Sequence, residues 1–576
     1  MKQKSIEELK DMLALAQSGS LHSIKEFKIA RDYYAGKQLP SDVIAVLQER
    51  GQPPIHENIL AMIMEKIEGY KSMARQDMVV VGRQREDRQK AEVLSDILKS
   101  ISDTPEYIRE KRASDTDLLL GLAVVEIYVK ELDSSDSFGT KEKAIKISRI
   151  SPTSFLLDPF SRKSDGSDAK YFIKCMGMDY EDALEAFGAK AQSLRTYHVS
   201  NYRKRVNVYE FWIKEREKGE SFWSRYVLGD IDVLLSYEKK PFKGGNHPFC
   251  IQKYATEGNA WYGFFRNLKP QIDFINFAEN RMANMIGSSK ILYEAGAVDD
   301  AEQFATDVNI DNAVVRVKDG AIASKRVQVM NNQPQIAALS AKIADARATA
   351  QRLSGLNDET LGLAVSRLSG SAIEQRNNAG VVSLQRFLLA SEAIDKEIFS
   401  RAIMLITHYF DAEQVFRIAE RDSSERYFTI NERERDEAGN LIINQDGRVS
   451  VKNRIDVGFY DISLHTVPHV KTKREDMLKS WGEIIKTILP LNPSLAEPLI
   501  PLMLRDTDSA VARDIEELLG AQKEQAQQGN PAQELELERA KLELEKLKAE
   551  IARIKADALK KVGEGREEMG RARINV

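Results

Sequence analysis

Three aspartates stand close together in segment 158–169, which reads DPFSRKSDGSDA. Asp158, Asp165 and Asp168 could hold a divalent metal ion, because carboxylate oxygens are the ligands that Mg²⁺ and Ca²⁺ prefer. A calcium loop of the EF-hand type would place Gly166 at position six and acids at positions one, three, five and twelve. Of those four positions only the fifth carries an acid. The calcium interpretation therefore fails, and a polar turn between the strands SFLLDP and KYFIKCM fits better.

No other set of residues forms a known catalytic pattern. The sequence has no G-x-x-x-x-G-K-[ST], no G-x-G-x-x-G and no G-x-S-x-G, so it lacks a phosphate cradle and a nucleophile elbow. His465 and His469 are four residues apart, but Pro468 lies between them in a strand-like segment, which does not suit a zinc site. We therefore expect no enzyme activity, no metal and no cofactor. A metal-dependent nuclease that uses the three aspartates is kept as an alternative.

Composition limits the class of protein. The 576 residues are too many for one ordinary core and predict two to four domains. The net charge of −4 lacks the basic excess of proteins that hold DNA by its phosphates, so DNA can pass but is not expected to stick. Two cysteines, Cys175 and Cys250, indicate a reducing compartment. The charged, amphipathic N-terminus and the lack of an apolar run of about 20 residues predict neither a signal peptide nor a membrane span.

Periodicity predicts an α+β fold that is mainly helical. Helices are expected through the first hundred residues, with capping boxes that begin at Ser5 and Ser23 and a further helix start at Thr104. Alternating apolar residues then predict a β-rich segment over about 122–255. The later elements are a strand-like NAVVRVKDG at 312–320, a long helix over about 371–409 and a second β segment over 425–466.

The C-terminal segment has a heptad pattern. Two sets of small or apolar residues repeat every seven positions: Leu537, Leu544 and Ile551 in one set, and Ala540, Leu547 and Ile554 in the other. Such spacing, with charged residues at the other positions, is typical of a coiled coil and predicts self-association. The alternative is a single amphipathic helix that packs on its own domain.

Four phrases, in the same order, resemble the portal proteins of tailed bacteriophages, particularly the portal family of short-tailed phages. The phrase around the aspartates matches the family at Pro152, Phe155, Asp158, Pro159, Ser167, Asp168, Ala169 and Tyr171. The other phrases are HENILAMIMEKIEGYKS, HPFCIQKYATEGNAWYGFFRNLKPQIDFIN and RLSGSAIEQRNNAGVVSLQRFLLASEAIDKEIFSRAIMLITHYF. The likeness covers about residues 20–470.

This resemblance implies a structural function without a catalytic site. Portal proteins of this family form a ring, usually a dodecamer, at one capsid vertex. The ring is the channel for DNA packaging and ejection and the joint to the tail. The implied partners are further copies of the chain, the terminase large subunit, head–tail adaptor and tail proteins, major capsid and scaffolding proteins, and double-stranded DNA, with no membrane. We expect the protein in the virion after synthesis in the host bacterial cytoplasm. A coiled-coil scaffold or assembly protein is the remaining alternative.

The architecture of the family divides the chain into regions named wing, stem, clip, tunnel loop, spine and crown. The resemblance places them as follows: 1–260 wing, 261–289 first stem helix, 290–332 clip, 333–352 second stem helix, 353–370 tunnel loop, 371–410 spine helix, 411–470 β-rich wing return, 471–530 crown and 531–576 heptad helix, which could form a barrel.

Basic residues in these regions are candidate contacts. Beside the channel they are Lys342, Arg347, Arg352 and Arg367, which could face DNA or form salt bridges between subunits with acids such as Asp345 and Asp358. In the clip they are Lys318, Lys325 and Arg326, which could meet the motor or the adaptor or be ordinary surface charges. Self-association is assigned to Leu537, Leu544, Leu547, Ile551 and Ile554.

Overall fold

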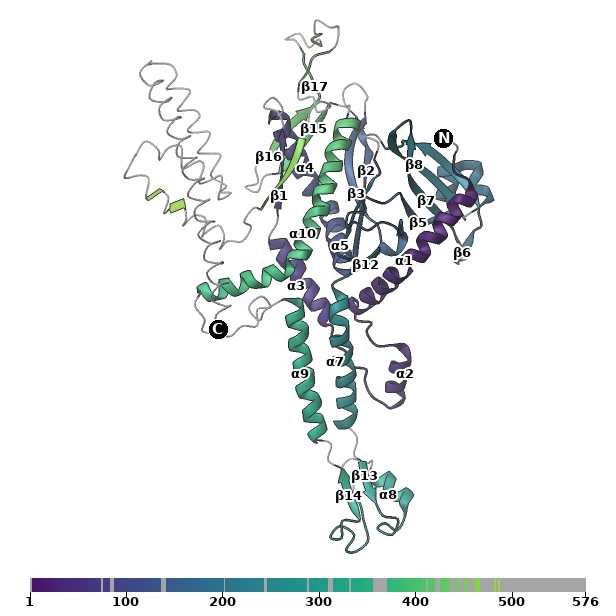
Figure 1. Ribbon diagram of the computed structural model, residues 1–576, viewed down its shortest axis with the longest axis vertical. Helices are drawn as coiled ribbons and strands as arrows, with labels where there is room; N and C mark the ends of the chain where they lie inside the picture. Colours follow the sequence, from purple (N-terminus) through teal and green to yellow (C-terminus); the bar gives the residue numbers. More distant parts are fainter. Residues whose placement is uncertain are drawn as a thin grey trace. The chain divides into compact units, whose positions relative to one another are not determined.

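A computed structural model gives the arrangement of the elements (Figure 1). It describes residues 3–73, 76–82, 88–135, 141–200, 202–230, 232–242, 246–286, 290–308, 314–330, 333–355, 370–410, 413–419, 425–435, 441–443, 449–452, 460–466, 481–482 and 485–486. The chain divides into two compact units, of which the first comprises Met1–Ser72, Met78–Ile418 and Tyr427–His465. The second comprises Met73–Asp77, Ala419–Arg426 and Thr466–Val576, and few of its residues are described.

The first hundred residues are mainly helical, as the sequence predicts, but the strand β1 (Gln76–Gly82) lies among these helices and departs from that prediction. Helix α1 begins after Ser5, whose hydroxyl accepts from the Glu8 amide while the Glu8 carboxylate accepts from the Ser5 amide. The second capping box was wrong, because α1 continues through Ser23, whose buried hydroxyl accepts from the Trp261 amide at 3.0 Å. Thr104 does cap a helix, as its spacing predicted. The helices are α1 (Ile6–Tyr34), α2 (Ser41–Glu49), α3 (Ile59–Met73), α4 (Arg88–Ser102) and α5 (Pro105–Leu120).

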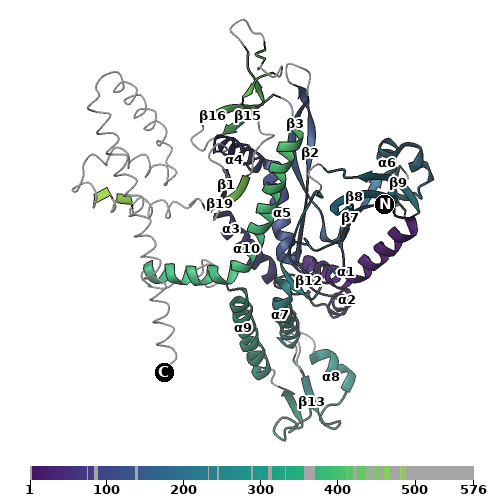
Figure 2. The same cartoon turned by 45° about the horizontal axis from the view of Figure 1, so that its top comes forward.

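The predicted β-rich segment is present and forms two antiparallel sheets (Figure 2). The three-stranded sheet has the order β10-β2-β3, from β2 (Leu122–Ser135), β3 (Lys141–Arg149) and β10 (Phe249–Lys253). The larger sheet has the order β4-β5-β7-β8-β9, with β6 paired to β7; its strands are β4 (Phe155–Leu157), β5 (Tyr171–Asp179), β6 (Tyr197–Ser200), β7 (Arg203–Glu217), β8 (Glu220–Gly229) and β9 (Val233–Lys239). The short elements nearby are η2 (Pro152–Ser154), α6 (Tyr180–Phe187), η3 (Gly188–Ser193), β11 (Ala255–Glu257) and β12 (Ala260–Tyr262).

Two helices then run side by side, with a small α/β tip between them in the chain (Figure 1, Figure 2). They are α7 (Phe265–Ile286) and α9 (Gln333–Ser354), and the tip consists of β13 (Lys290–Tyr293), α8 (Ala301–Val308) and β14 (Val327–Met330). Strands β13 and β14 pair antiparallel, with Lys290 opposite Met330. The strand predicted at 312–320 was wrong over its described residues, 314–320, because Val314 is 96% exposed and no strand pairs with it.

The long helix and the second β segment follow as predicted. Helix α10 (Gly370–Tyr409) packs against α5 and β10. The strands after it are β15 (Gln414–Ala419), β16 (Glu425–Ile430), β17 (Glu432–Arg433), β18 (Val451–Lys452) and β19 (Tyr460–Thr466), which pairs with β1 (Gln76–Gly82). Among the described residues no helix is both long enough and apolar enough to cross a bilayer.

An aromatic cluster lies where the two sheets meet the α10 helix. The His247 ring lies 4.8 Å from the Phe172 ring and 4.6 Å from the Trp223 ring, centroid to centroid. Its Nδ1 accepts from the Phe249 amide and lies 3.2 Å from the Arg401 guanidinium. Burial, and then the charge of Arg401, lowers the pKa of His247 well below its ordinary value of 6.5. The imidazole is therefore neutral in the folded chain at neutral pH.

This buried imidazole makes stability depend on pH. Below pH 6.5 the unfolded chain takes up a proton on His247 that the folded chain does not, so the free energy of unfolding falls as the pH falls. Between pH 6.5 and 5.5 the free energy of unfolding of the wild-type chain should fall by about 1 kcal/mol more than that of His247→Asn. Urea unfolding followed by tryptophan fluorescence measures this difference. Parallel pH profiles for the two proteins would contradict it.

Candidate functional site

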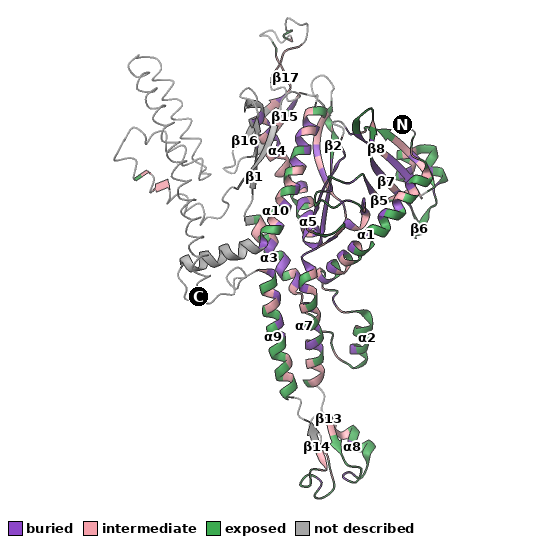
Figure 3. Ribbon diagram, viewed as in Figure 1, coloured by how far each residue is buried: buried purple, intermediate pink, exposed green. Residues whose placement is uncertain are grey.

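Helices α7 and α9 pack on each other through a small apolar contact. Ile275 and Ala278 of α7 form one buried cluster with Ile343 and Ala346 of α9. The chain follows α7 to the tip and returns along α9, so the two helices are antiparallel (Figure 1). The face of α9 that points away from α7 is exposed, whereas most of α7 is buried or half-buried (Figure 3). The pair is therefore a two-helix arm in which one face of α9 stays exposed.

A row of asparagines fastens α7 to the extended segment 52–58. The Asn280 side-chain amide donates to the Ile55 carbonyl at 2.6 Å and its oxygen accepts from the Ile55 amide at 3.0 Å. One turn earlier, Asn276 donates to the Gln38 side chain at 2.7 Å and accepts from the Glu57 amide at 3.1 Å. Buried amide groups must find such partners, so these bonds hold the arm to the N-terminal helices.

Removing one of these amides should loosen the segment that it holds. Asn280→Ala leaves the Ile55 amide and carbonyl without their side-chain partner, and should lower the free energy of unfolding by about 1–3 kcal/mol. Hydrogen–deuterium exchange of the peptide 52–58 should become faster. Asn267→Ala, at an exposed position of the same helix, is the control and should change neither quantity. Equal exchange in both variants would contradict the fastening role of Asn280.

The candidate channel residues lie on or near α9 but differ in their surroundings. Arg347 is held by Glu279 at 2.7 Å and by Glu57, both in the same chain. Lys342 is 70% exposed and lies 3.6 Å from Asp345. The remaining two are Arg352, which is exposed and donates to the Thr349 hydroxyl, and Arg367, which lies outside the described residues, as does Asp358.

The candidate clip residues lie together in the tip. Lys318 is exposed and lies 3.4 Å from Asp299. Lys325, also exposed, has a φ of 53°, and its turn ends at Arg326, whose guanidinium donates to the Ser324 hydroxyl at 3.0 Å. The turn thus presents cations on the surface of the tip.

The three aspartates of segment 158–169 serve the backbone of a turn. Asp158 accepts from the amides of Phe160 and Lys170, and Asp168 accepts from the amide of Arg162 at 2.7 Å. The strands β4 and β5 flank this turn and pair antiparallel, which confirms the structural interpretation. Among the described residues no cluster of three or more histidines, cysteines, aspartates or glutamates could hold a metal ion.

Sequence reasoning missed the lysine that anchors this turn. Lys253 is 1% exposed, and its ammonium group donates to the Ser161 carbonyl at 2.9 Å and to the Ser161 hydroxyl. Burial lowers the pKa of Lys253, and the nearby aspartates, first among them Asp168, oppose that change. Because Lys253 and Ser161 are 92 positions apart, no local pattern could reveal the contact.

The residues assigned to self-association, Leu537, Leu544, Leu547, Ile551 and Ile554, lie outside the described part of the chain. Their role in self-association stays a prediction.

Comparison with known proteins decides the family. The model of the phage P22-like portal protein family matches residues 10–561. The chain belongs to this family. A portal protein of Helicobacter pylori bacteriophage KHP30 is 38% identical over 499 residues, which cover 86% of this chain and 78% of that protein. Portal proteins are structural components of the phage and not enzymes. The aspartates of this portal protein therefore need no catalytic explanation, and the nuclease alternative is set aside.

Proposed function

We propose that copies of this portal protein form a ring of about twelve subunits at one capsid vertex. The ring is the channel for DNA packaging by terminase and for DNA ejection, and the attachment point for the tail. The observation that carries this proposal is the family match over residues 10–561. The α7–α9 arm supports it, because such arms, repeated by rotation, would wall a central channel.

The proposal gives each region a function within the ring. In it α7 and α9 are the stem, the tip is the clip, α10 is the spine, and the N-terminal helices and the two antiparallel sheets are the wing. The regions proposed mainly from the family resemblance, since most of their residues are not described, are the tunnel loop at 353–370, the crown at 471–530 and the heptad helix at 531–576.

The charges along the arm suit a wall that DNA slides past. The guanidinium of Arg347 pairs with two carboxylates, those of Glu57 and Glu279. The three side chains together therefore carry a net negative charge. A wall of that kind avoids the exchange of counterions at every phosphate. Lys342 is exposed, and together with Arg352 and Arg367 it is the proposed source of weak contacts with DNA.

The tip is proposed to meet the terminase during packaging and the head–tail adaptor afterwards. Lys318 and Lys325 are exposed there, and Arg326 follows them in the same turn. Rotation would convert each of these cations into a ring of positive charge, which suits an acidic surface on the partner. The wing would contact the major capsid and scaffolding proteins.

Deleting the gene from the phage that encodes this chain tests the proposed function. Without the chain, infected cells should accumulate capsids that contain no DNA, because packaging has no entrance. A copy of the gene supplied from a plasmid should restore DNA-filled heads, and it serves as the control. DNA-filled heads in the absence of the chain would contradict the proposal.

A further inference from the structure

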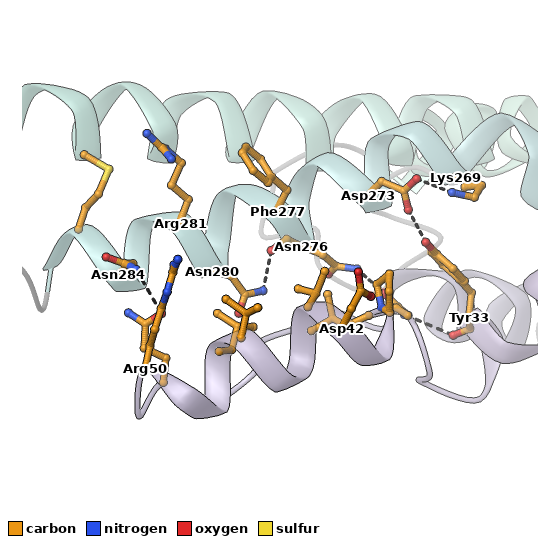
Figure 4. A pocket seen from close by; sticks show the side chains of 18 residues that line it. Tyr33, Asp42, Arg50, Lys269, Asp273, Asn276, Phe277, Asn280, Arg281 and Asn284 are labelled. Carbon is orange, nitrogen blue, oxygen red and sulfur yellow. Dashed lines mark hydrogen bonds and ion pairs between the residues drawn. The ribbon is translucent and has the colours of Figure 1, made fainter.

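A groove of about 780 Å³ runs along α7 and is lined by side chains of α2 and α7. Helix α2 lines it with Val43 and Val46, and α7 lines it with Phe277 and Met285. Val46 is 43% exposed and Phe277 is 61% exposed. Figure 4 shows the asparagines of α7 turned toward α2, whereas Phe277 and Arg281, which also line the groove, lie on the side of α7 away from α2. Apolar side chains gathered and exposed in this way mark a contact surface.

The same chain carries a face that fits this groove. On α9 the side chains that pack against α7 are those of Leu339, Ile343 and Ala346. The opposite face of α9 carries alanines at helical spacing, all exposed: Ala337, Ala341, Ala344 and Ala348. We call this face the alanine seam. Because alanine projects little from a helix, the seam lets another helix come close and receive large side chains.

The groove and the alanine seam lie at the same height, meaning the position along the axes of α7 and α9. Since Ile275 and Ala278 pack with Ile343 and Ala346, Phe277 lies within about one helical turn of the height of Ala344. A rotation about the ring axis, with no rise, keeps every residue at its height. The alanine seam of one subunit would therefore face the groove of its neighbour near Phe277.

Charges at the edges of the two surfaces are opposite. Arg281 lines the groove, is exposed, and has no ion pair among the described residues. Asp345 lies beside the alanine seam and is 62% exposed. It lies 3.6 Å from Lys342, which is itself exposed. Arg281 and Asp345 are about a helical turn apart in height, within the reach of an arginine side chain.

We infer that the α2–α7 groove of each subunit receives the alanine seam of α9 from the next copy of this chain. The inference rests on the proposed ring and names the residues of the contact: Phe277 packs on Ala344, and Arg281 pairs with Asp345. Helix α9 of each subunit then packs between its own α7 and the α2–α7 groove of the neighbouring subunit.

Cross-linking between subunits tests the contact directly. The double variant Phe277→Cys, Ala344→Cys, treated with an oxidant or a short bismaleimide, should give a ladder of covalent multimers, whereas either single variant should give none. The alanine seam of α9 faces away from the α7 of its own chain, so the link can only join different chains. The native cysteines do not compete, because Cys250 is fully buried and burial raises the pKa of Cys175 to about 11.

The failure of the contact can be told from the failure of the ring. Rings of the double variant whose chains stay single after cross-linking would overturn the contact and leave the ring standing. The native mass of the unmodified chain shows whether a ring forms at all. If none forms, both the ring and the contact are wrong.

A charge placed in the seam gives a second test. Ala344→Glu should raise at least 10-fold the concentration at which half of the chains assemble, because a carboxylate would be buried against Phe277. Its circular dichroism as a monomer should be unchanged, since the position is exposed. The matched control is Ala186→Glu, at an exposed alanine of α6. Equal assembly of the two variants would overturn the contact.

Discussion

Replacing Asp115 with alanine is expected to lower the free energy of unfolding by about 3–5 kcal/mol, because it leaves two buried ammonium groups with one carboxylate instead of two. Asp115 lies 2.5 Å from Lys111 and also pairs with Lys71, and all three side chains are largely buried. Asp395 of α10 completes the cluster at 3.0 Å from Lys111. The cluster joins α3, α5 and α10, and after the substitution two lysines would share one carboxylate. Urea unfolding measures the change.

A surface ion pair provides the control for this prediction. Asp232 pairs with Lys10, and their side chains are 48% and 40% exposed. Asp232→Ala should therefore change the free energy of unfolding by less than about 1 kcal/mol. Similar small changes in both variants would show that the cluster of Asp115 does not hold the three helices together.

Phe172→Ala should lower the free energy of unfolding by about 3–5 kcal/mol, through lost burial and the cavity that remains. The Phe172 ring is fully buried and lies 5.3 Å from the Trp223 ring and 5.8 Å from the Phe155 ring, centroid to centroid. It fills the space where the larger sheet meets the smaller one. The fluorescence of Trp223 should change in the folded state as its neighbour disappears.

The control for Phe172 lies in the nearby turn. Phe160 is 76% exposed, so Phe160→Ala should change stability by no more than about 0.5 kcal/mol. If Phe172→Ala were as stable as this control, the aromatic cluster would not form the junction between the sheets.

Local patterns in the sequence were enough for elements whose signals lie within a few residues. The cap at Ser5 and the helix start at Thr104 are confirmed, since each depends on contacts within one turn. The same four-residue pattern misled at Ser23, because the partner of its hydroxyl is Trp261, 238 positions away. The capping pattern alone does not distinguish a serine that caps a helix from a serine within a helix whose hydroxyl accepts from a distant backbone amide.

The candidate site shows the same limit. The turn of the three aspartates could be predicted, because their acceptor oxygens serve amides within 12 positions. The pairing of Arg347 with Glu57 joins residues 290 positions apart, and the asparagine row joins α7 to a segment more than 200 positions earlier. Such contacts depend on packing between helices, which periodicity alone does not specify. For this reason the basic residues of α9 could be named as candidates but not sorted by their surroundings.

The mass and shape of the purified chain, measured by native mass spectrometry and negative-stain microscopy, test the proposed ring most directly. We expect particles of about twelve times 65.1 kDa with a central channel. A chain that ends at residue 530 should still form them, because the wing and stem supply most of the proposed contacts. Monomers or rod-like dimers, or oligomers that dissolve when residues 531–576 are removed, would contradict the ring and favour a coiled-coil scaffold.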